Sequence, residues 1–366
     1  MIRSISWRNF DFLLLGAIVL ATAFGAAMIR SAVAANEVLE PLILRQVYFA
    51  LLGIALIFFL ASIDYRYWLA LYRPIYLVMM LLLVALFLNA RAVFGAARWF
   101  QVGVLFLQPT EFAKIVVILI LARYFEQTQF GPHGVRWILR AFFWAFWLLI
   151  WILLQPNLSN VIVIAVLLGA MLWINGLKPR HMLYGALIAI LVLAAAFPFL
   201  QDYQKERLLT FVFPDPNATF GSTYNVQQAL IAIGSGGFLG KGYGHGTQTQ
   251  LRFLKVRHTD FVFSAVSEEF GLLGGILVIL VLAFVVWRCI RAAQKARDLA
   301  GAMIAYGVGV LIFFQAAVNI GVNLNILPVS GLPLPFLSYG GSGLTALMIG
   351  IGLVESVVMR HKQLEF

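Results

Sequence analysis

The sequence predicts an all-α fold, a polytopic transmembrane bundle of about ten spans with one large extracytoplasmic loop between spans 7 and 8. The first observation is composition. The 366 residues are 62% hydrophobic and 11% charged, whereas soluble proteins average roughly 45–50% apolar and 25% charged residues. The second is the recurrence of apolar runs of about 17 to 25 residues, each able to cross a hydrocarbon layer of roughly 30 Å. We therefore expect the bilayer to be the solvent of this fold.

Run length and flanking polar residues place the individual helices in order. We expect them near residues 11–29, 44–63, 74–90, 109–123, 139–155, 158–176, 182–200, 263–287, 302–323 and 340–358. The first run is too long and too poorly flanked for a cleaved signal peptide, so it is predicted to remain as an anchor. Because the sequence has no period of a soluble repeat family, residues 1–366 are predicted to form a single integral membrane domain.

The distribution of positive charge predicts the orientation of these spans. With both termini assigned to the cytoplasm, the inner loops carry most of the arginines and lysines, among them Arg66, Arg140, Arg180 and Arg291. The short outer segments carry few, and this asymmetry is the positive-inside pattern. The same placement accounts for the formal charge of +11, so nucleic acid is not an expected partner.

The segment 201–261 is predicted to be a large extracytoplasmic loop. A connection of that length usually has a function of its own. Its glycines, concentrated at 234–237 and 240–246, allow backbone to approach a bulky ligand or form anion-binding turns. A flexible tether explains them equally well, although the apolar stretch 226–233 favours a loop that partly dips into the membrane interface.

Cysteine and motif content exclude several classes of chemistry. Cys289 is the only cysteine, so a disulfide within the chain is impossible. We find no metal-ligand spacing of His, Cys and acidic residues, no P-loop and no nucleophile elbow. Nucleotide-dependent chemistry is therefore not expected.

Glu111 and Lys114 form the clearest candidate site inside a predicted span. Charges in a span cost a few kcal/mol each and are functional candidates by default. Pro109 can open the helix at its first turn, and the two charges three residues apart share one face and can neutralise each other. One interpretation is a buried ion pair that only fixes helix packing. The other is a polar cavity open to the outside, which the nearby Arg98 favours.

Asp260 is the second candidate, at the end of the large loop just before an apolar helix. Asp is a favoured N-cap residue, and Thr259 beside it could cap equally well. The functional alternative is that a partly desolvated carboxylate at the membrane surface has a raised pKa and acts as a general base. Spacing alone leaves both interpretations open.

Two further polar groups flank the ends of predicted helices. Glu268 and Glu269 are adjacent, so at most one could face the cavity that Asp260 would face, and we interpret both as structural. The segment 338–342 opens the last helix, where exposed amides attract phosphate. A flexible start to the span explains that segment as well.

Several of these residues lie in stretches that resemble the SEDS family of membrane proteins. The stretches are residues 95–99, 108–114, 206–209, 227–237, 258–261 and 331–342. Nearly the whole chain takes part. The short N-terminus and compact length are more similar to the rod-shape determining branch (RodA) than to the division branch (FtsW).

The resemblance implies a peptidoglycan glycosyltransferase of the bacterial cytoplasmic (inner) membrane that joins lipid II units on the extracytoplasmic face for cell-wall elongation. It implies a complex with a class B penicillin-binding protein, a transpeptidase, and contacts with other elongation-complex membrane proteins and with membrane lipids. Asp260 aligns with the essential acidic residue of the family. The substrate contacts expected by this similarity are Glu111, Lys114, Arg98, Arg207, His258 and Ser338.

Three places in the sequence depart from the family pattern. The family commonly reads Gln-Pro-Asp-Leu-Gly where residues 155–159 read Gln-Pro-Asn-Leu-Ser, so an acidic group is missing at Asn157. Lys255 and Val256 replace a frequent Pro-Glu, and Asn325 stands where glycine is usual. None of these departures falls on the expected catalytic or substrate-binding residues.

The implied reaction needs one base, because forming a β-1,4 bond from an α-pyrophosphate inverts the anomeric carbon in a single displacement. Asp260 would take the proton of the acceptor 4-hydroxyl. Lys114 and Arg98 could stabilise the departing pyrophosphate, and the resemblance leaves open help from a divalent cation, Mg²⁺ or Mn²⁺. The alternatives are a lipid II flippase and a non-catalytic scaffold. The absence of a second copy of segment 108–114 argues against an inverted-repeat transporter.

Overall fold

The computed structural model describes residues 7–34, 39–89, 99–102, 105–215 and 218–360, and these residues are mostly helical. Each of the ten predicted runs corresponds to one helix. The helices of these runs are α1 (Phe12–Val33), α2 (Pro41–Ser62), α4 (Tyr72–Asn89), α5 (Pro109–Thr128), α6 (Val135–Leu154), α7 (Leu158–Ile174), α8 (Pro179–Ala196), α12 (Val262–Gln294), α13 (Leu299–Asn323) and α14 (Gly341–Met359).

Smaller elements complete the described chain. They are α3 (Tyr65–Ala70), α9 (Asp202–Val212), α10 (Gly221–Gly236), α11 (Thr247–Gln250), the 3-10 turns η1 (Trp7–Asn9) and η2 (Phe197–Phe199), and the strands β1 (Phe100–Val102) and β2 (Leu105–Leu107). The two strands pair antiparallel, with Phe100 opposite Leu107. This hairpin departs from the all-α prediction.

Among the described residues, six helices are both long and apolar enough to cross a membrane: α1, α2, α6, α12, α13 and α14. The helices α4, α7 and α8 contain shorter apolar segments. In α5 the charged residues Glu111, Lys114, Arg123 and Glu126 lower the apolar content of a 20-residue helix. The chain is thus a multi-pass helical membrane protein by length and composition.

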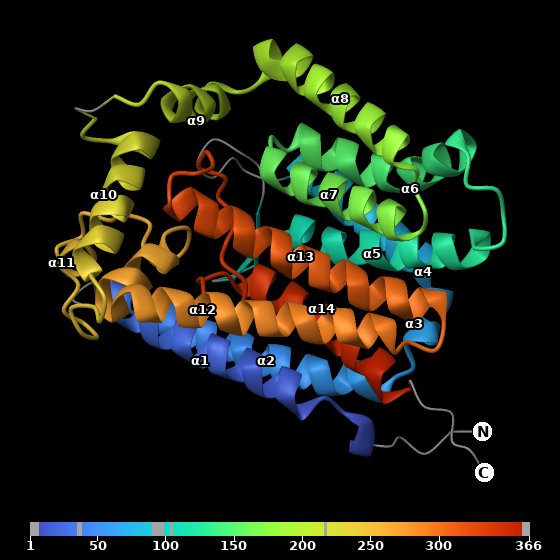
Figure 1. Cartoon of the computed structure of the whole chain (residues 1–366), viewed down its shortest axis with the longest axis horizontal. Helices are drawn as coiled ribbons and strands as arrows, with labels where there is room; N and C mark the ends of the chain where they lie inside the picture. The colour runs from blue at the N-terminus through green and yellow to red at the C-terminus, as the bar shows by residue number, and fades with distance from the viewer. Residues whose placement is uncertain (1–6, 35–38, 90–98, 103–104, 216–217, 361–366) are drawn as a thin grey trace.

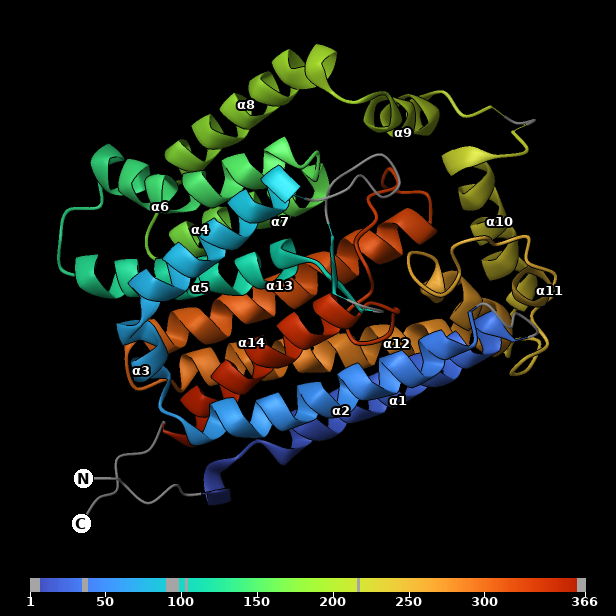
Figure 2. The same ribbon diagram turned by 180° about the vertical axis from the view of Figure 1, so that it is seen from behind.

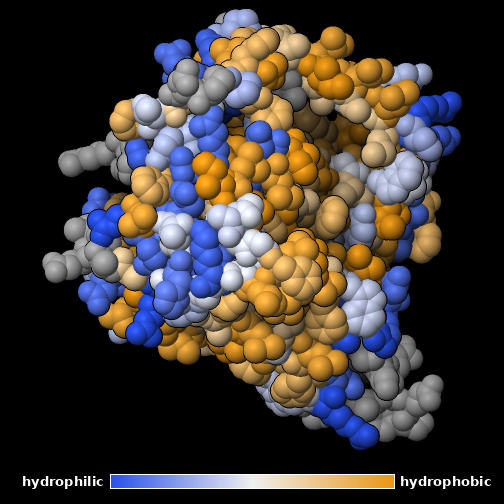
Figure 3. Space-filling model, turned by 60° about the vertical axis from the view of Figure 1, so that its left-hand side comes forward, coloured by the Kyte–Doolittle hydropathy of each residue, from blue (hydrophilic) through white to orange (hydrophobic). Residues whose placement is uncertain are grey.

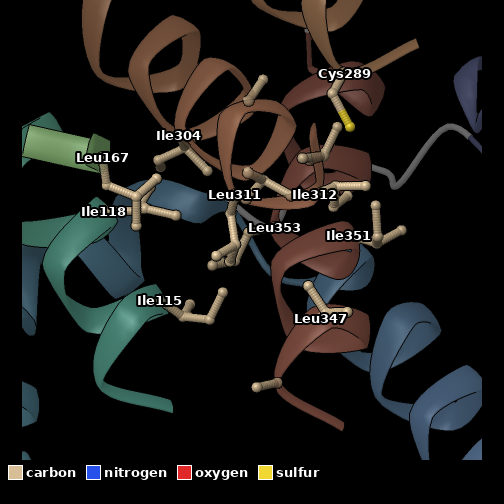
Figure 4. Packing of buried hydrophobic residues seen from close by; sticks show 14 of the residues in the cluster. Ile115, Ile118, Leu167, Cys289, Ile304, Leu311, Ile312, Leu347, Ile351 and Leu353 are labelled. Carbon is tan, nitrogen blue, oxygen red and sulfur yellow. The ribbon is translucent and has the colours of Figure 1, made fainter. Parts of the chain in front are cut away.

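The helices α5, α13 and α14 form the centre of the bundle. Residues 115–122 of α5 are all buried, and nearly every residue of α14 is buried. Ile115 and Ile118 point toward Leu311 of α13 and Leu353 of α14 (Figure 4). Small residues let these helices approach closely: a Cβ on Gly307 would lie 2.8 Å from a side-chain carbon of Ile118.

The helices α8 and α9 stand at the edge of the molecule, away from α1 and α2 (Figures 1 and 2). Nearly all the described side chains of α8 are exposed, including Leu187, Ile190 and Leu191. Exposed aliphatic side chains on a helix of a membrane protein are expected to face lipid. In Figure 3, hydrophobic surface flanks a more hydrophilic face at the end that carries α10 and α11.

The segment 201–261, predicted to be a loop, contains the three helices α9, α10 and α11. Two of its glycines, Gly236 and Gly240, have a packing role that differs from the predicted ligand contact. A Cβ on Gly236 would lie 1.9 Å from the backbone oxygen of Ser267, and one on Gly240 would lie 2.2 Å from that of Glu269. Only glycine permits this approach, so the turn after α10 rests directly on the backbone of α12.

That contact coincides with a break in α12 at Gly271, which has φ +66° and ψ −160°. The backbone N–H groups of Lys241 and Gly242 donate to the carbonyls of Glu268 and Glu269, at 3.0 and 2.9 Å. In return, Leu272 donates to the carbonyl of Gly237 at 2.9 Å. A break in an apolar helix of a membrane protein requires such partners for the backbone groups that it frees.

Glu268 and Glu269 anchor the same region, in agreement with their structural interpretation. Glu268 is fully buried; it pairs with Lys241 at 3.0 Å and accepts backbone N–H bonds from Gln248 and Thr249 at 2.8 and 3.1 Å. Glu269 accepts a hydrogen bond from the hydroxyl of Ser31 on α1. These contacts fix the glycine-rich turns to the start of α12.

Candidate active site

Asp260 lies in a turn just before α12, but its carboxylate does not cap the helix. The N-cap residue is Phe261, and neither its side chain nor that of Asp260 accepts from the first turn; the N–H of Ser264 in that turn donates to Asn323 of α13 instead. The hydroxyl of Thr259 donates to the carbonyl of Val256 at 3.4 Å, so Thr259 is not the cap either. The capping explanation for an acidic residue here is therefore removed.

The backbone of this turn is held by two buried asparagines of α13. The side-chain amides of Asn319 and Asn323 donate to the carbonyl of Asp260 at 3.0 and 2.9 Å. Asn323 also accepts from the N–H and the hydroxyl of Ser264, at 3.0 and 2.6 Å. Because these bonds use the carbonyl of Asp260, its carboxylate stays available while its position is fixed.

The segment 331–340 holds the other side of the turn. The Ser338 hydroxyl donates to the carbonyl of Thr259 at 2.5 Å and accepts from Leu334 N–H at 2.9 Å. The N–H of Tyr339 donates to the carbonyl of His258 at 2.9 Å. Arg257 is buried and donates to the carbonyl of Ala32 at 2.5 Å, which ties the turn to α1.

Arg207 of α9 faces Asp260 across Gly331. A Cβ on Gly331 would lie 3.7 Å from Nη1 of Arg207 and 3.9 Å from Oδ2 of Asp260. Gly331 has φ +73°, a conformation that glycine adopts without strain. The helix α9 is docked by Tyr203, whose hydroxyl donates to the carbonyl of Pro156 at 2.6 Å and whose ring lies 5.7 Å from the Arg207 guanidinium. A carboxylate and a guanidinium thus face the same small space.

Two hollows border Arg207. One, of about 110 Å³, lies between the start of α7, α9 and residues 328–330, and its polar lining includes Asn157, Ser159, Gln204 and Arg207. The other, of about 50 Å³, lies between α9, α10 and residues 325–329; polar and apolar residues line it in equal number, but the surface they present to it is mostly apolar. A ligand with a charged head and an apolar tail would find both kinds of surface beside Arg207.

Electrostatics at the turn favour a carboxyl group that can exchange protons. Burial raises the pKa of Asp260 above its ordinary value, while the charge of Arg207 and a hydrogen bond from Thr259 lower it. Burial and the charge of Arg257 lower the pKa of His258 to about 4. His258 is therefore neutral near pH 7 and can take part in hydrogen bonds without adding a positive charge.

Glu111 and Lys114 form an ion pair of 2.7 Å in which both side chains are buried. Lys114 also donates to Oδ1 of Asn160 on α7 at 3.2 Å. Asn160 in turn donates to Thr110 at 3.1 Å and to Glu111 at 3.4 Å. The packing interpretation of this pair is thus well supported by its surroundings.

The ion pair and the Asp260 turn are linked through neighbouring residues. Ser159, next to Asn160, donates to the carbonyl of Ser330 at 2.5 Å, directly beside Gly331. Ser330 begins the segment 330–343, and at the other end of this segment a Cβ on Gly343 would lie 3.4 Å from Oε2 of Glu111. The start of α7 and the segment 330–343 therefore contact both groups of charged residues.

The described residues contain no group of three or more His, Cys, Asp or Glu side chains placed to hold a metal ion. The divalent cation left open by the sequence therefore has no ready carboxylate cluster within this part of the chain. No step of the mechanism below depends on one.

The family model for cell cycle proteins of the FtsW, RodA and SpoVE type matches residues 8–363. The chain belongs to this family. The SEDS resemblance is thereby confirmed. One relative is the peptidoglycan glycosyltransferase MrdB of Escherichia coli (strain K12). It is 35% identical to this chain over 322 residues, and the match covers 86% of this chain and 84% of MrdB. A probable peptidoglycan glycosyltransferase FtsW of Hydrogenovibrio crunogenus is 33% identical over 376 residues, covering 96% and 92%.

Solved structures extend the similarity of this FtsW/RodA/SpoVE protein to the fold. A chain from a peptidoglycan synthase complex, studied for the coordination of polymerization and crosslinking, has a TM-score of 0.82 and 31% identity. The match covers 98% of this chain and 100% of the chain from the complex. The rod shape determining protein RodA of Thermus thermophilus has a TM-score of 0.73 and 29% identity, covering 98% and 99%.

Not all the residues predicted to contact substrate come together. Arg207, His258 and Asp260 lie in one neighbourhood. Ser338 adjoins them, but its hydroxyl is already engaged by the backbone. Glu111 and Lys114 are buried where α5 meets the start of α7. Arg98 lies outside the described residues. Their contact with substrate stays a prediction.

The departures from the family pattern acquire a structural setting. Asn157 lines the hollow beside Arg207, and its side-chain amide donates to Thr110 at 3.4 Å. The Lys255 ammonium lies 4.6 Å from the centre of the Phe220 ring, a cation–π contact with the N-cap residue of α10. Asn325 has φ +55°, a left-handed conformation that asparagine tolerates better than most residues.

Sequence reasoning missed Asn160, Asn319 and Asn323. A signal for the last two was present, because Gln315, Asn319 and Asn323 recur every fourth residue in an otherwise apolar helix. Polar residues at that spacing share one helix face, and inside a membrane that face must meet protein or water. What the sequence could not supply was the partner, the backbone carbonyl of Asp260.

Proposed function

We propose that this chain polymerises lipid II into glycan strands for cell-wall elongation, as an inverting glycosyltransferase with Asp260 as its general base. Membership of the FtsW/RodA/SpoVE family and the names of its relatives support peptidoglycan glycosyltransferase activity. One observation of the structure carries the assignment of the site. The carboxylate of Asp260 has no capping role and faces Arg207 across Gly331.

In the proposed reaction, the 4-hydroxyl of the acceptor sugar transfers its proton to the Asp260 carboxylate as the oxygen attacks the anomeric carbon of the donor. The bond between that carbon and the prenyl pyrophosphate breaks in the same step, with inversion. The pyrophosphate leaves with its electron pair, and the Arg207 guanidinium stabilises the negative charge. Neutral His258 supplies hydrogen bonding to the sugar or the phosphate.

The membrane arrangement is part of the proposal. We infer ten crossings, formed by α1, α2, α4 to α8 and α12 to α14, with both termini in the cytoplasm and residues 201–261 outside, between the seventh and eighth crossings. The positive-inside distribution supports this orientation. The hydrogen bond of 3.0 Å between Asp11 N–H and Glu355 places the start of α1 beside the end of α14, as an even number of crossings requires.

The expected partner is a class B penicillin-binding protein that crosslinks the glycan product, within a larger elongation complex. The similarity to a chain of a peptidoglycan synthase complex supports this proposal. The exposed apolar surface of α8 and the exposed α9 leave room for lipid or for helices of a partner.

Reconstitution tests the proposed function against leaflet exchange of the same lipid. Purified protein is incubated with labelled lipid II in liposomes, with and without the penicillin-binding protein. We expect glycan strands of several disaccharide units on gels, because the Asp260 carboxylate and the Arg207 guanidinium face the same site. Transfer of lipid II between leaflets without any strand formation would favour the flippase and overturn the proposal.

Arg207→Gln is expected to lower the polymerisation rate and to move its acidic limb to higher pH. The base must be ionised, so activity is present above the pKa of Asp260 and is lost as pH falls through it. Burial raises that pKa and Arg207 opposes the rise, so removing the guanidinium lets the pKa rise further. Well above both pKa values, loss of leaving-group stabilisation should still lower the rate about 10²-fold.

The measurement is the initial rate of lipid II polymerisation as a function of pH. Arg207→Lys is the matched variant, because it keeps the charge and should keep the acidic limb where it is in the unmodified protein. An unchanged pH profile in Arg207→Gln would show that Arg207 does not act on Asp260.

A further inference from the structure

A third hollow, lined by several charged residues, lies at the far end of the bundle from Asp260. It encloses about 190 Å³ and is lined by residues from the start of α1, the last turns of α12 and the end of α14. These helix ends lie at the end of the bundle that carries both termini (Figure 1). Along α12, the distance from Val262 to Arg288 is roughly 40 Å at 1.5 Å per residue. The proposed mechanism uses none of the residues that line this hollow.

The lining is dominated by positive charge. Arg288, Arg291 and Lys295 surround one acidic residue, Asp11. The carboxylate of Asp11 is fully engaged: Oδ1 accepts from Leu14 N–H at 3.0 Å, and Oδ2 accepts from Arg288 at 2.6 Å. Within the described ranges, Arg291 and Lys295 have no carboxylate in ion-pair contact, and both are exposed. An anionic group therefore finds two cations that the fold has not neutralised.

Two of the arginines that line the hollow lie beside a side chain typical of a membrane interface. Trp287 is 49% exposed, and the guanidinium groups of Arg288 and Arg291 lie 5.6 and 5.3 Å from its ring. Tryptophan is enriched at the depth of lipid head groups. From there, exposed Leu280 and Leu277 continue at helical spacing along α12, which provides an apolar track for an acyl chain.

We propose that this hollow binds the phosphodiester head group of an anionic phospholipid in the leaflet at that end of the bundle. Arg291 and Lys295 pair with the phosphate, and the ion pair with Asp11 fixes Arg288 beside them. One acyl chain lies on the exposed apolar side chains between Trp287 and Leu277. The apolar track and the interfacial tryptophan favour a lipid over a free phosphate, which would use only the cations. Such a lipid would join the ends of α1, α12 and α14.

The test measures lipid retained by the purified full-length protein after delipidation in detergent, by native mass spectrometry. The protein is first equilibrated with vesicles of phosphatidylcholine that contain one-fifth phosphatidylglycerol. The variant Arg291→Gln with Lys295→Gln removes both unpaired cations. Its matched control, Arg180→Gln with Arg297→Gln, removes two exposed arginines that do not line the hollow. Thermal unfolding confirms that both variants remain folded.

We expect the unmodified protein and the control to retain phosphatidylglycerol in preference to phosphatidylcholine, and the pocket variant to retain at least tenfold less of it. Inorganic phosphate at millimolar concentration should not displace the lipid. Equal retention of the two lipids, or equal retention of phosphatidylglycerol by all three proteins, would overturn the proposal. Displacement by inorganic phosphate alone would assign the hollow to a soluble phosphate and would also overturn it.

Discussion

Asp260→Asn is expected to lower lipid II polymerisation by about 10²- to 10⁴-fold, the usual contribution of a general base. The asparagine amide has nearly the shape of the carboxylate, but it cannot accept the proton of the attacking hydroxyl. Folding should be preserved, because Asn319 and Asn323 bind the backbone carbonyl of residue 260 and the first turn of α12 is bonded by Asn323, not by the side chain of residue 260. The measurement is the initial rate with purified protein and labelled lipid II.

Asp202→Asn is the matched control for this prediction. Asp202 is an exposed aspartate at the start of α9, in the same segment that carries Arg207. The substitution removes the same charge but not the proposed base, so the rate should stay within about twofold of the unmodified protein. Both variants should unfold at similar temperatures. Full activity in Asp260→Asn would refute the assignment of the base.

Most of the helical fold could be predicted from the sequence because the bilayer imposes a length on each apolar run. The prediction was least accurate where that constraint is absent. Helix α10 has only 16 residues and its first half is mostly polar, so neither its length nor its composition distinguishes it from a loop. At the break at Gly271, the backbone N–H groups of residues 241 and 242 donate to the carbonyls of residues 268 and 269, and no local sequence pattern reveals such contacts between distant residues.

The candidate site was partly predictable for a related reason. Asp260 stands out in the sequence because a carboxylate beside a membrane helix is costly unless it has a purpose. Its surroundings depend on contacts between distant segments. Arg207 is brought to it by the docking of Tyr203 on Pro156, and its turn is held by α13. The N-cap alternative could be rejected only once Phe261 was seen to occupy that position.

Removing one partner of the buried ion pair is expected to destabilise the protein by about 3–5 kcal/mol. In Glu111→Gln the Lys114 ammonium, 1% exposed, loses its counter-charge and keeps only neutral acceptors, such as the amide oxygen of Asn160 at 3.2 Å. In Lys114→Met the Glu111 carboxylate keeps only weak donors, such as Asn160 at 3.4 Å. Thermal unfolding of each purified variant in the same detergent measures the loss.

The double variant Glu111→Gln with Lys114→Met separates stability from activity. Because no uncompensated charge remains buried, the free energy of unfolding should recover to within about 1–2 kcal/mol of the unmodified protein. Polymerisation should nevertheless stay at least tenfold low. Without the hydrogen bond from Lys114, Asn160 at the start of α7 is held less firmly. Because the neighbouring Ser159 donates to the carbonyl of Ser330, the backbone beside Gly331 and Asp260 should then be positioned less precisely. If activity recovered together with stability, the pair would serve packing alone, and the predicted part of Glu111 and Lys114 in handling substrate would be wrong.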